Sequence, residues 1–204
     1  RNTAIGFKSQ EATTTSRYNT SVGSYSLYTN TTGEWNTSVG DASLAQNTTG
    51  SNNCAFGQQA LYLNSTANDN SAFGTFALGN NTTGRRNVGV GCSALASNTT
   101  GQRSVAIGQL AMFTNTTGDY NVAIGRASMY TNNASSNTAV GYESLYANTT
   151  GTDNVAVGRD ALKANTTGDY NTAVGRDALD ANTTGDHNTA IGRNALTANT
   201  TADN

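Results

Sequence analysis

Proline does not occur in the 204 residues, although turn-forming residues recur along the whole chain. Because proline has no backbone N–H to donate to a β-sheet, its absence favours a fold in which every N–H is needed. Cysteine is almost as rare, since Cys54 and Cys92 are the only two. They occupy different positions of the repeat described below and lie two units apart, so we expect no intrachain disulfide.

Charge is scarce as well, with 12% of residues charged and a formal net charge of −2. A nucleic-acid partner would need a basic stripe, so the composition predicts no nucleic-acid binding. No apolar run approaches the ~18 residues of a membrane span, so we expect no membrane insertion in this segment. One histidine, His187, and no clustered cysteines predict no metal site.

Glycine, in contrast, is abundant and periodic. A glycine closes each of twelve repeat units, and successive ones are 17 residues apart except for one step of 16. A fixed period of this size is the signature of a repeat architecture, in which each unit stacks on its neighbours. The closing glycines are Gly6, Gly23, Gly40, Gly57, Gly74, Gly91, Gly108, Gly125, Gly141, Gly158, Gly175 and Gly192.

Two columns of the aligned units are apolar, and we expect both to line the inside of each coil. On this interpretation Val157→Asp would bury a charge and abolish local folding. The residue before each closing glycine is β-branched or aromatic, as a strand prefers: Ile5, Val22, Val39, Phe56, Phe73, Val90, Ile107, Ile124, Val140, Val157, Val174 and Ile191. The residue four places after the glycine is Gln10, Leu27, Leu44, Leu61, Leu78, Leu95, Met112, Met129, Leu145, Leu162, Leu179 or Leu196.

Two further columns contain only small residues, which indicates close approach of neighbouring segments. Two interpretations remain open: a thin, flattened coil interior, or a subunit contact along the length of a rod. One column is Ala4, Ser21, Ser38, Ala55, Ala72, Gly89, Ala106, Ala123, Ala139, Ala156, Ala173 and Ala190. The other is Ser9, Ser26, Ser43, Ala60, Ala77, Ala94, Ala111, Ser128, Ser144, Ala161, Ala178 and Ala195.

Strand and turn signals alternate within each unit. Asn-Thr-Thr-Gly recurs, as in residues 165–168, and Asn and Gly both favour tight turns. The step of 16 falls in such a turn, at residues 132–136, where a deletion leaves the strand phase intact. Period-two alternation, as in residues 121–124, is typical of a strand. Two short strands and two turns per unit predict a parallel β-solenoid.

Asparagine precedes the strand pattern in all units but one, where Ser104 replaces it. Stacked coil upon coil, these amides would form a ladder of hydrogen bonds along the axis. The column comprises Asn2, Asn19, Asn36, Asn53, Asn70, Asn87, Asn121, Asn137, Asn154, Asn171 and Asn188.

Residues 121–125 (Asn-Val-Ala-Ile-Gly) and 171–175 (Asn-Thr-Ala-Val-Gly) resemble the head repeats of trimeric autotransporter adhesins. Units that also contain Asn-Thr-Thr-Gly and Ala-Leu are similar to repeats of phage tail-fibre and related surface proteins. The resemblance extends over the whole chain. It implies a left-handed parallel β-roll in which three chains lie side by side.

Candidate catalytic groups are few. Asp160 and Asp177 occupy one column beside Arg159 and Arg176 in the next. They could be the paired carboxylates of a glycosidase, but a solvated ladder of alternating charges is the interpretation we favour. His187 lies in a turn, and we expect a surface residue without a catalytic role.

Three binding hypotheses remain secondary. Gly-Asp turns could bind calcium, Thr-Thr pairs could bind ice, and an aromatic column could stack on sugar rings. We favour turn residues and scattered surface aromatics instead. The aspartates are Asp119, Asp169 and Asp186, and the aromatic column is Tyr28, Tyr62, Phe113, Tyr130 and Tyr146.

The sequence therefore predicts one all-β domain over residues 1–204, a parallel solenoid of about twelve 17-residue coils and a segment of a longer fibrous protein. We expect no catalytic, cofactor-binding or metal-binding residues. The function indicated is a non-enzymatic structural or adhesive fibre segment on a cell or virion surface. Its partners would be identical chains, with a trimer favoured, and possible surface glycans. A self-assembling extracellular filament is the alternative, followed by an ice- or glycan-binding solenoid.

Overall fold

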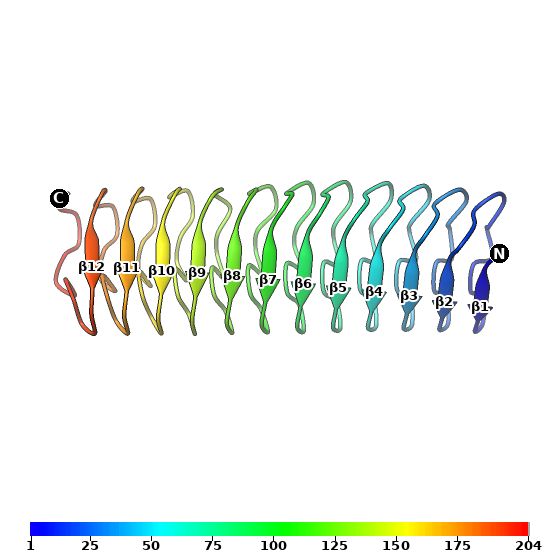
Figure 1. Cartoon of the computed structure of the whole chain (residues 1–204), viewed down its shortest axis with the longest axis horizontal. Coiled ribbons are helices and arrows are strands. Elements are labelled where there is room, and N and C mark those ends of the chain that lie inside the picture. Colours follow the sequence, from blue (N-terminus) through cyan, green and yellow to red (C-terminus); the bar gives the residue numbers. More distant parts are fainter. Residues whose placement is uncertain (204) are drawn as a thin grey trace.

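The computed structural model describes residues 1–203, which form an elongated rod with the two chain ends at opposite tips (Figure 1). Twelve strands make one sheet whose order follows the chain, and all eleven neighbouring pairs are parallel. The strands span about eleven turns, and the described residues contain no helix. The prediction of an all-β parallel solenoid is confirmed.

Each strand is three residues long and lies beside its repeat neighbours (Figure 1). The strands are β1 (Thr3–Ile5), β2 (Thr20–Val22), β3 (Thr37–Val39), β4 (Cys54–Phe56), β5 (Ser71–Phe73), β6 (Val88–Val90), β7 (Val105–Ile107), β8 (Val122–Ile124), β9 (Thr138–Val140), β10 (Val155–Val157), β11 (Thr172–Val174) and β12 (Thr189–Ile191). Equivalent residues pair directly, as Ala156 does with Ala173. The stacking is therefore in register along the whole rod.

The second strand expected in each coil is absent from the described residues. The segment after each closing glycine is instead a series of turns in which every second residue has a positive φ, such as Asp177 (57°) and Leu179 (52°). The N–H of Asp177 donates to the Arg159 carbonyl at 2.9 Å, and that of Leu179 donates to the Ala195 carbonyl at 2.9 Å. The first bond reaches the preceding coil and the second reaches the following coil. These bonds between coils stabilise a positive φ, which leucine rarely adopts.

Side-chain directions correct one prediction and confirm another. The Leu/Met column lies in the core, where Leu162 and Met129 are fully buried, as expected. The residue before the closing glycine was expected inside as well, and that prediction is wrong. Val157 is only half-buried and Ile124 is exposed, because side chains alternate across a strand and the middle residue points inward. The coil interior holds one large apolar side chain, together with small residues and buried asparagines.

Both small columns form the coil interior, so the first of the two interpretations holds. Ala156 and Ala161 are fully buried within one coil, and the serines Ser26 and Ser38 are buried and bonded to each other at 2.8 Å. A subunit contact through these columns is therefore wrong, since no second chain can reach them.

Two ladders of buried asparagines run along the axis. In the predicted ladder, the Asn171 backbone N–H donates to Oδ1 of Asn154 at 2.9 Å. Ser104 continues it, with its Oγ accepting from the Asn121 N–H at 3.1 Å. The second ladder uses the asparagine of the Asn-Thr-Thr-Gly turn, where Nδ2 of Asn165 donates to Oδ1 of Asn148 at 3.0 Å. The sequence pattern indicates only a turn for that asparagine, so this second ladder is a finding of the structure.

The coil between β8 and β9 is one residue short, yet Val122 still pairs with Thr138 in phase, as predicted. In a regular coil the Thr99 carbonyl accepts the N–H groups of Thr82 and Thr83, at 3.0 and 3.1 Å. In the short coil, Oδ1 of Asn133 accepts the equivalent N–H groups of Thr116 and Thr117, in the preceding coil, at 2.9 and 3.1 Å. A side-chain amide therefore replaces a backbone carbonyl where the residue is missing.

The closing glycines have φ between 123° and 145°, a region that glycine adopts without the steric cost of a side chain. At Gly158 a Cβ would also clash with the backbone carbonyl of Gly175 in the next coil. Any larger residue would therefore force neighbouring coils apart.

Candidate functional site

The largest surface feature is the outer side of the sheet, which we call the outward sheet face. It consists of the first and third residues of every strand, and Figure 1 shows these strands side by side along one flank. The first residues are Thr3, Thr20, Thr37, Cys54, Ser71, Val88, Val105, Val122, Thr138, Val155, Thr172 and Thr189. The third residues are the apolar column named above, with Phe56, Phe73, Ile107 and Ile124 each between 37% and 40% exposed.

The outward sheet face lies at the upper end of the size range of apolar patches on monomers. Twelve strands at ~4.8 Å and three residues at ~3.3 Å give a face of about 58 by 10 Å, which is about 580 Å², and most of its side chains are apolar. Contiguous apolar patches on monomeric proteins usually cover about 300–600 Å². A standard protein interface buries about 800 Å² on each partner. The outward sheet face is somewhat smaller than that, and its apolar chemistry is that of an interaction surface.

The face is not uniform along the rod. Phe56 and Phe73 stack on each other with ring centroids 5.3 Å apart, and Cys54 lies on the same part of the face. Burial raises the pKa of the Cys54 thiol. Val and Ile dominate from β6 to β12, so the phenylalanines form a local ridge in an otherwise β-branched surface.

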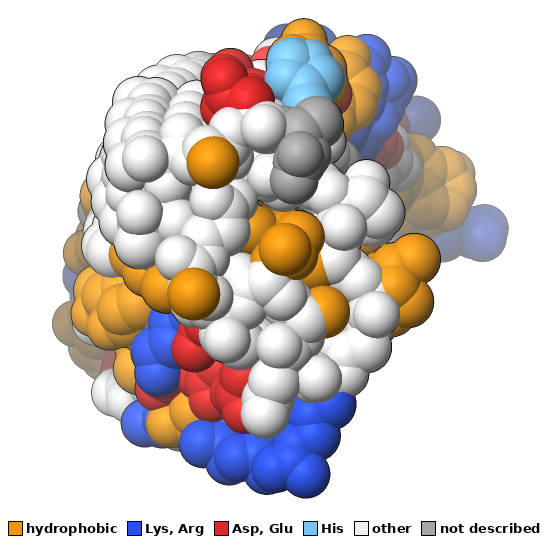
Figure 2. Space-filling model, turned by 90° about the vertical axis from the view of Figure 1, so that its left-hand side faces the viewer, with side chains coloured by type: hydrophobic (Ala, Val, Ile, Leu, Met, Phe, Trp, Pro, Cys, Tyr) orange, Lys and Arg blue, Asp and Glu red, His pale blue; other side chains and the backbone are white. Residues whose placement is uncertain are grey.

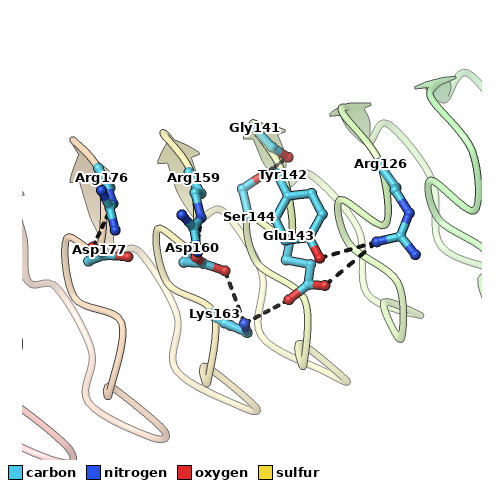
Figure 3. Close-up of polar contacts among 10 residues, drawn as sticks. All are labelled: Arg126, Gly141, Tyr142, Glu143, Ser144, Arg159, Asp160, Lys163, Arg176 and Asp177. Carbon is cyan, nitrogen blue, oxygen red and sulfur yellow. Dashed lines mark hydrogen bonds and ion pairs between the residues drawn. The ribbon is translucent and has the colours of Figure 1, made fainter.

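An ion-pair network crosses the coils of β8 to β10 at the turn after the closing glycine, and a separate Arg176–Asp177 pair lies in the coil of β11 (Figure 3). Lys163 Nζ lies 2.7 Å from Glu143 Oε2 and 3.0 Å from Asp160 Oδ1. The hydrogen bond from Lys163 is the main cause of a lowered pKa of Glu143, and the bond from Tyr142 is the second cause. The hydrogen bond to Glu143 is likewise the main cause of a raised pKa of Lys163, and the bond to Asp160 is the second. Arg126 donates to the Tyr142 hydroxyl at 3.2 Å and completes the network.

The two candidate carboxylates are both engaged by cations. Asp160 Oδ2 is 2.9 Å from Arg159 Nε, and Asp177 Oδ2 is 3.0 Å from Arg176 Nε. Each carboxylate is therefore paired with the arginine beside it and not with the other carboxylate. The pairing agrees with the alternating charges of the favoured interpretation, but Asp160 is buried, so the ladder is not solvated throughout.

The remaining titratable candidates are held by local contacts. His187 is exposed and stacks on Tyr170 with ring centroids 5.0 Å apart. Asp169 and Asp186 each use Oδ1 to accept a backbone N–H of the preceding coil, at 2.6 and 2.7 Å. Residues 1–203 contain no group of three or more His, Cys, Asp or Glu side chains that could hold a metal ion. The same residues contain no helix long and apolar enough to cross a membrane.

Three residues of the aromatic column are stacked in a row, whereas Tyr28 packs edge-on against Tyr25. Tyr130 lies between Phe113 and Tyr146, with centroid distances of 5.4 and 5.1 Å. Because these rings cover one another's faces, they leave mainly their edges for a sugar. Tyr18 and Trp35 form a separate stack at 4.2 Å, beside an open hollow of about 540 Å³ in which Arg1 is the one charged side chain.

The Thr-Thr pairs divide into two roles. The first hydroxyl is used within the stack, as when Oγ1 of Thr166 donates to the Thr183 carbonyl at 2.9 Å. The second threonine, for example Thr167 or Thr184, is exposed. The exposed hydroxyls therefore form a single row along a turn, whereas an ice lattice calls for a two-dimensional grid.

The outward sheet face was missed in the sequence because its Val/Ile column was assigned to the core. One signal could have identified it. In Asn-Thr-Ala-Val-Gly the middle residue, alanine, is small in every unit, whereas the residues on either side of it vary. Since side chains alternate across a strand, the position that is always small is the one that points into the crowded interior.

Comparisons of the chain with models of known protein families, with curated proteins and with solved structures found no match.

Proposed function

We propose that the chain is a non-enzymatic structural or adhesive fibre segment on a cell surface or a virion. The in-register rod with a continuous apolar flank supports this proposal. A rod of this kind spaces or presents an adhesive end, and the ion-paired carboxylates offer no free acid–base pair. An extracellular location follows from the same role.

The partners we propose are identical chains, packed through the outward sheet face. This face replaces the small-residue columns considered from the sequence, which are buried in the coil. When Val, Ile and Phe side chains of one copy pack against the same residues of another copy, both sets are removed from water. The burial of apolar surface is the main favourable contribution to association. Three chains are the stoichiometry implied by the resemblance to adhesin heads.

The test is the mass of the isolated array in solution, measured by analytical ultracentrifugation at several concentrations. Wild type should sediment as a defined oligomer, and the pair Val140→Asp and Val157→Asp should sediment as a folded monomer. The control places the same charges outside the face, at the exposed Thr150 and Thr167. A wild-type chain that stays monomeric throughout would refute the proposal.

An end-to-end filament is the alternative assembly, and it makes a different prediction. Stacking through coil ends would give a series of lengths that grows with concentration, visible by electron microscopy. The double-aspartate variant would leave such growth intact, because the outward sheet face takes no part in it.

Ice and glycan binding are weaker candidates. The ridge of Phe56 and Phe73 interrupts the plane that ice would need, and the aromatic column buries its own ring faces. Thermal hysteresis measurements and a glycan array test the two possibilities directly.

A further inference from the structure

The outward sheet face has two edges of opposite charge in the last five coils. The basic edge follows the closing glycine and consists of exposed arginines: Arg126, Arg159, Arg176 and Arg193. The acidic edge lies on the other side of the strands, one or two residues before the strand asparagine: Asp119, Asp153, Asp169 and Asp186. Figure 2 views one end of the rod: the histidine lies at the top beside an acidic side chain, and Lys and Arg gather at the bottom together with further acidic side chains.

The two edges match coil by coil. The coils of β8, β10, β11 and β12 have an arginine on one edge and an aspartate on the other. The coil of β9 has neither, because Tyr142 occupies the basic edge and Ser135 and Ser136 the acidic edge. In the coils of β4 to β7, by contrast, the residue after the closing glycine is uncharged: Gln58, Thr75, Cys92 and Gln109.

Contacts within the chain leave part of each edge unused. Arg159 and Arg176 meet their own aspartates through Nε, so the terminal guanidinium nitrogens have no ion-pair partner in residues 1–203. Asp169 and Asp186 use one oxygen for a backbone N–H, and neither is paired with a cation of the described chain. Arg159 and Arg176 are thus already ion-paired within the chain, and what each edge offers a neighbouring molecule is its unused guanidinium N–H groups and carboxylate oxygens.

We propose that the basic edge of one chain pairs with the acidic edge of a second copy, which makes the assembly parallel and in register. This inference rests on the proposed association through the outward sheet face. With no offset, four arginines face four aspartates and the neutral coil faces its equal. An offset of one coil places Arg126 opposite Ser135, or opposite Arg103 in the other direction.

Antiparallel packing sets the basic edge against the same edge of the other copy. Arg159 then faces Asp41, but Arg126, Arg176 and Arg193 face the uncharged Thr75, Ser24 and Phe7. Only one of the four arginines would meet a carboxylate.

These pairs lie at the rim of the face, and their role follows from that position. Rim charges contribute modestly to affinity but suppress wrong alignments and make association depend on salt. The apolar face would therefore hold the chains together, and the two edges would choose direction and register.

Charge reversal tests the pairing. Arg159→Glu with Arg176→Glu should weaken association about tenfold at low salt, from loss of two rim pairs and their replacement by repulsion. Arg17→Glu with Arg85→Glu makes the same change in net charge at exposed sites opposite uncharged positions, and it should have little effect. Adding Asp153→Lys and Asp169→Lys to the first pair should restore association. Thermal melting of each variant checks that the coils remain folded.

Energy transfer tests the direction. Labels are placed at Thr32→Cys or Thr167→Cys in a chain with Cys54→Ser and Cys92→Ser, about 38 Å apart along the rod. Mixed donor and acceptor chains should transfer energy strongly when both labels are at residue 167 and weakly when one is at residue 32. The reverse result would mean antiparallel packing and would overturn the inference.

The outcomes separate the two proposals. If wild type is monomeric, both fail. If wild type assembles but the arginine reversal acts no more strongly than its control, or the added lysines restore nothing, association stands and the edge pairing is refuted.

Discussion

The two sides of the one sheet obey different rules. On the inner side, Ala106, Ala123 and Ala156 are fully buried, and only Ala, Ser or Gly occurs at that position in any coil. On the outer side, one residue away, Ile107 and Ile124 remain more than a third exposed. The inner residues are fixed by the space inside a coil, whereas nothing within the coil requires a large apolar residue outside. The association through the outward sheet face that we propose would give these outer side chains the cover that the coil itself does not provide.

The largest expected contrast comes from shortening one side chain on each side. Leu162→Ala removes a fully buried side chain and should cost about 2–5 kcal/mol through lost burial and a cavity. Val157→Ala, on the outer side, should cost less than about 1 kcal/mol in the dilute monomer. Chemical denaturation at low concentration measures both. Equal losses would remove the distinction between the two sides.

Next in size is the asparagine ladder, which supports the interior from the turn. Asn165→Ala removes bonds of 3.0 Å to Asn148 and 3.0 Å to the Gly168 carbonyl, and it leaves the Asn182 amide short of a partner. The buried unsatisfied groups should cost about 1–3 kcal/mol. Thr167→Ala is the matched change on the exposed side of the same turn, and its melting curve should stay close to wild type. A ladder variant as stable as this control would show that the amides contribute nothing.

A charge on the outer side should affect folding still less. From the sequence, Val157→Asp was expected to abolish local folding, but the half-buried outward position gives the carboxylate access to water. The variant should keep a cooperative melting transition while losing association. Circular dichroism and sedimentation on the same samples separate the two effects, and loss of the transition would return Val157 to the core.

The smallest effect concerns pH. Hydrogen bonds lower the pKa of Glu143 below its ordinary value of 4.5, so its ionised form is stabilised in the fold. That contribution is fully present above the ordinary pKa and is lost as the pH falls through the lowered one. Lys163→Met should therefore reduce the acid sensitivity of melting below about pH 4.5. An unchanged acid profile in the variant would show that the network does not couple to folding.

Much of the fold could be predicted from the sequence, because a period of 17 and a strand pattern ending in glycine specify stacked parallel strands. Which residues of the strand point into the coil could not be predicted. Val157 and Leu162 are both apolar, and the pattern alone does not show which of them is buried. The structure resolves this through the turn at Leu162, whose positive φ of 51° goes with a fully buried side chain. The role of Asn133 could not be predicted either. Its side chain replaces a backbone carbonyl in one coil only, so no repeated residue in the sequence indicates it.

The most direct test of the central claim uses the two native thiols. Cys54 lies on the outward sheet face, whereas Cys92 is exposed beyond a closing glycine, so one chain carries both probe and control. Alkylation of each thiol is followed by mass spectrometry as the protein concentration is raised. The account predicts that Cys54 becomes protected as chains associate while Cys92 slows far less. Reaction of Cys54 at a rate independent of concentration, in a chain shown to be oligomeric, would contradict it.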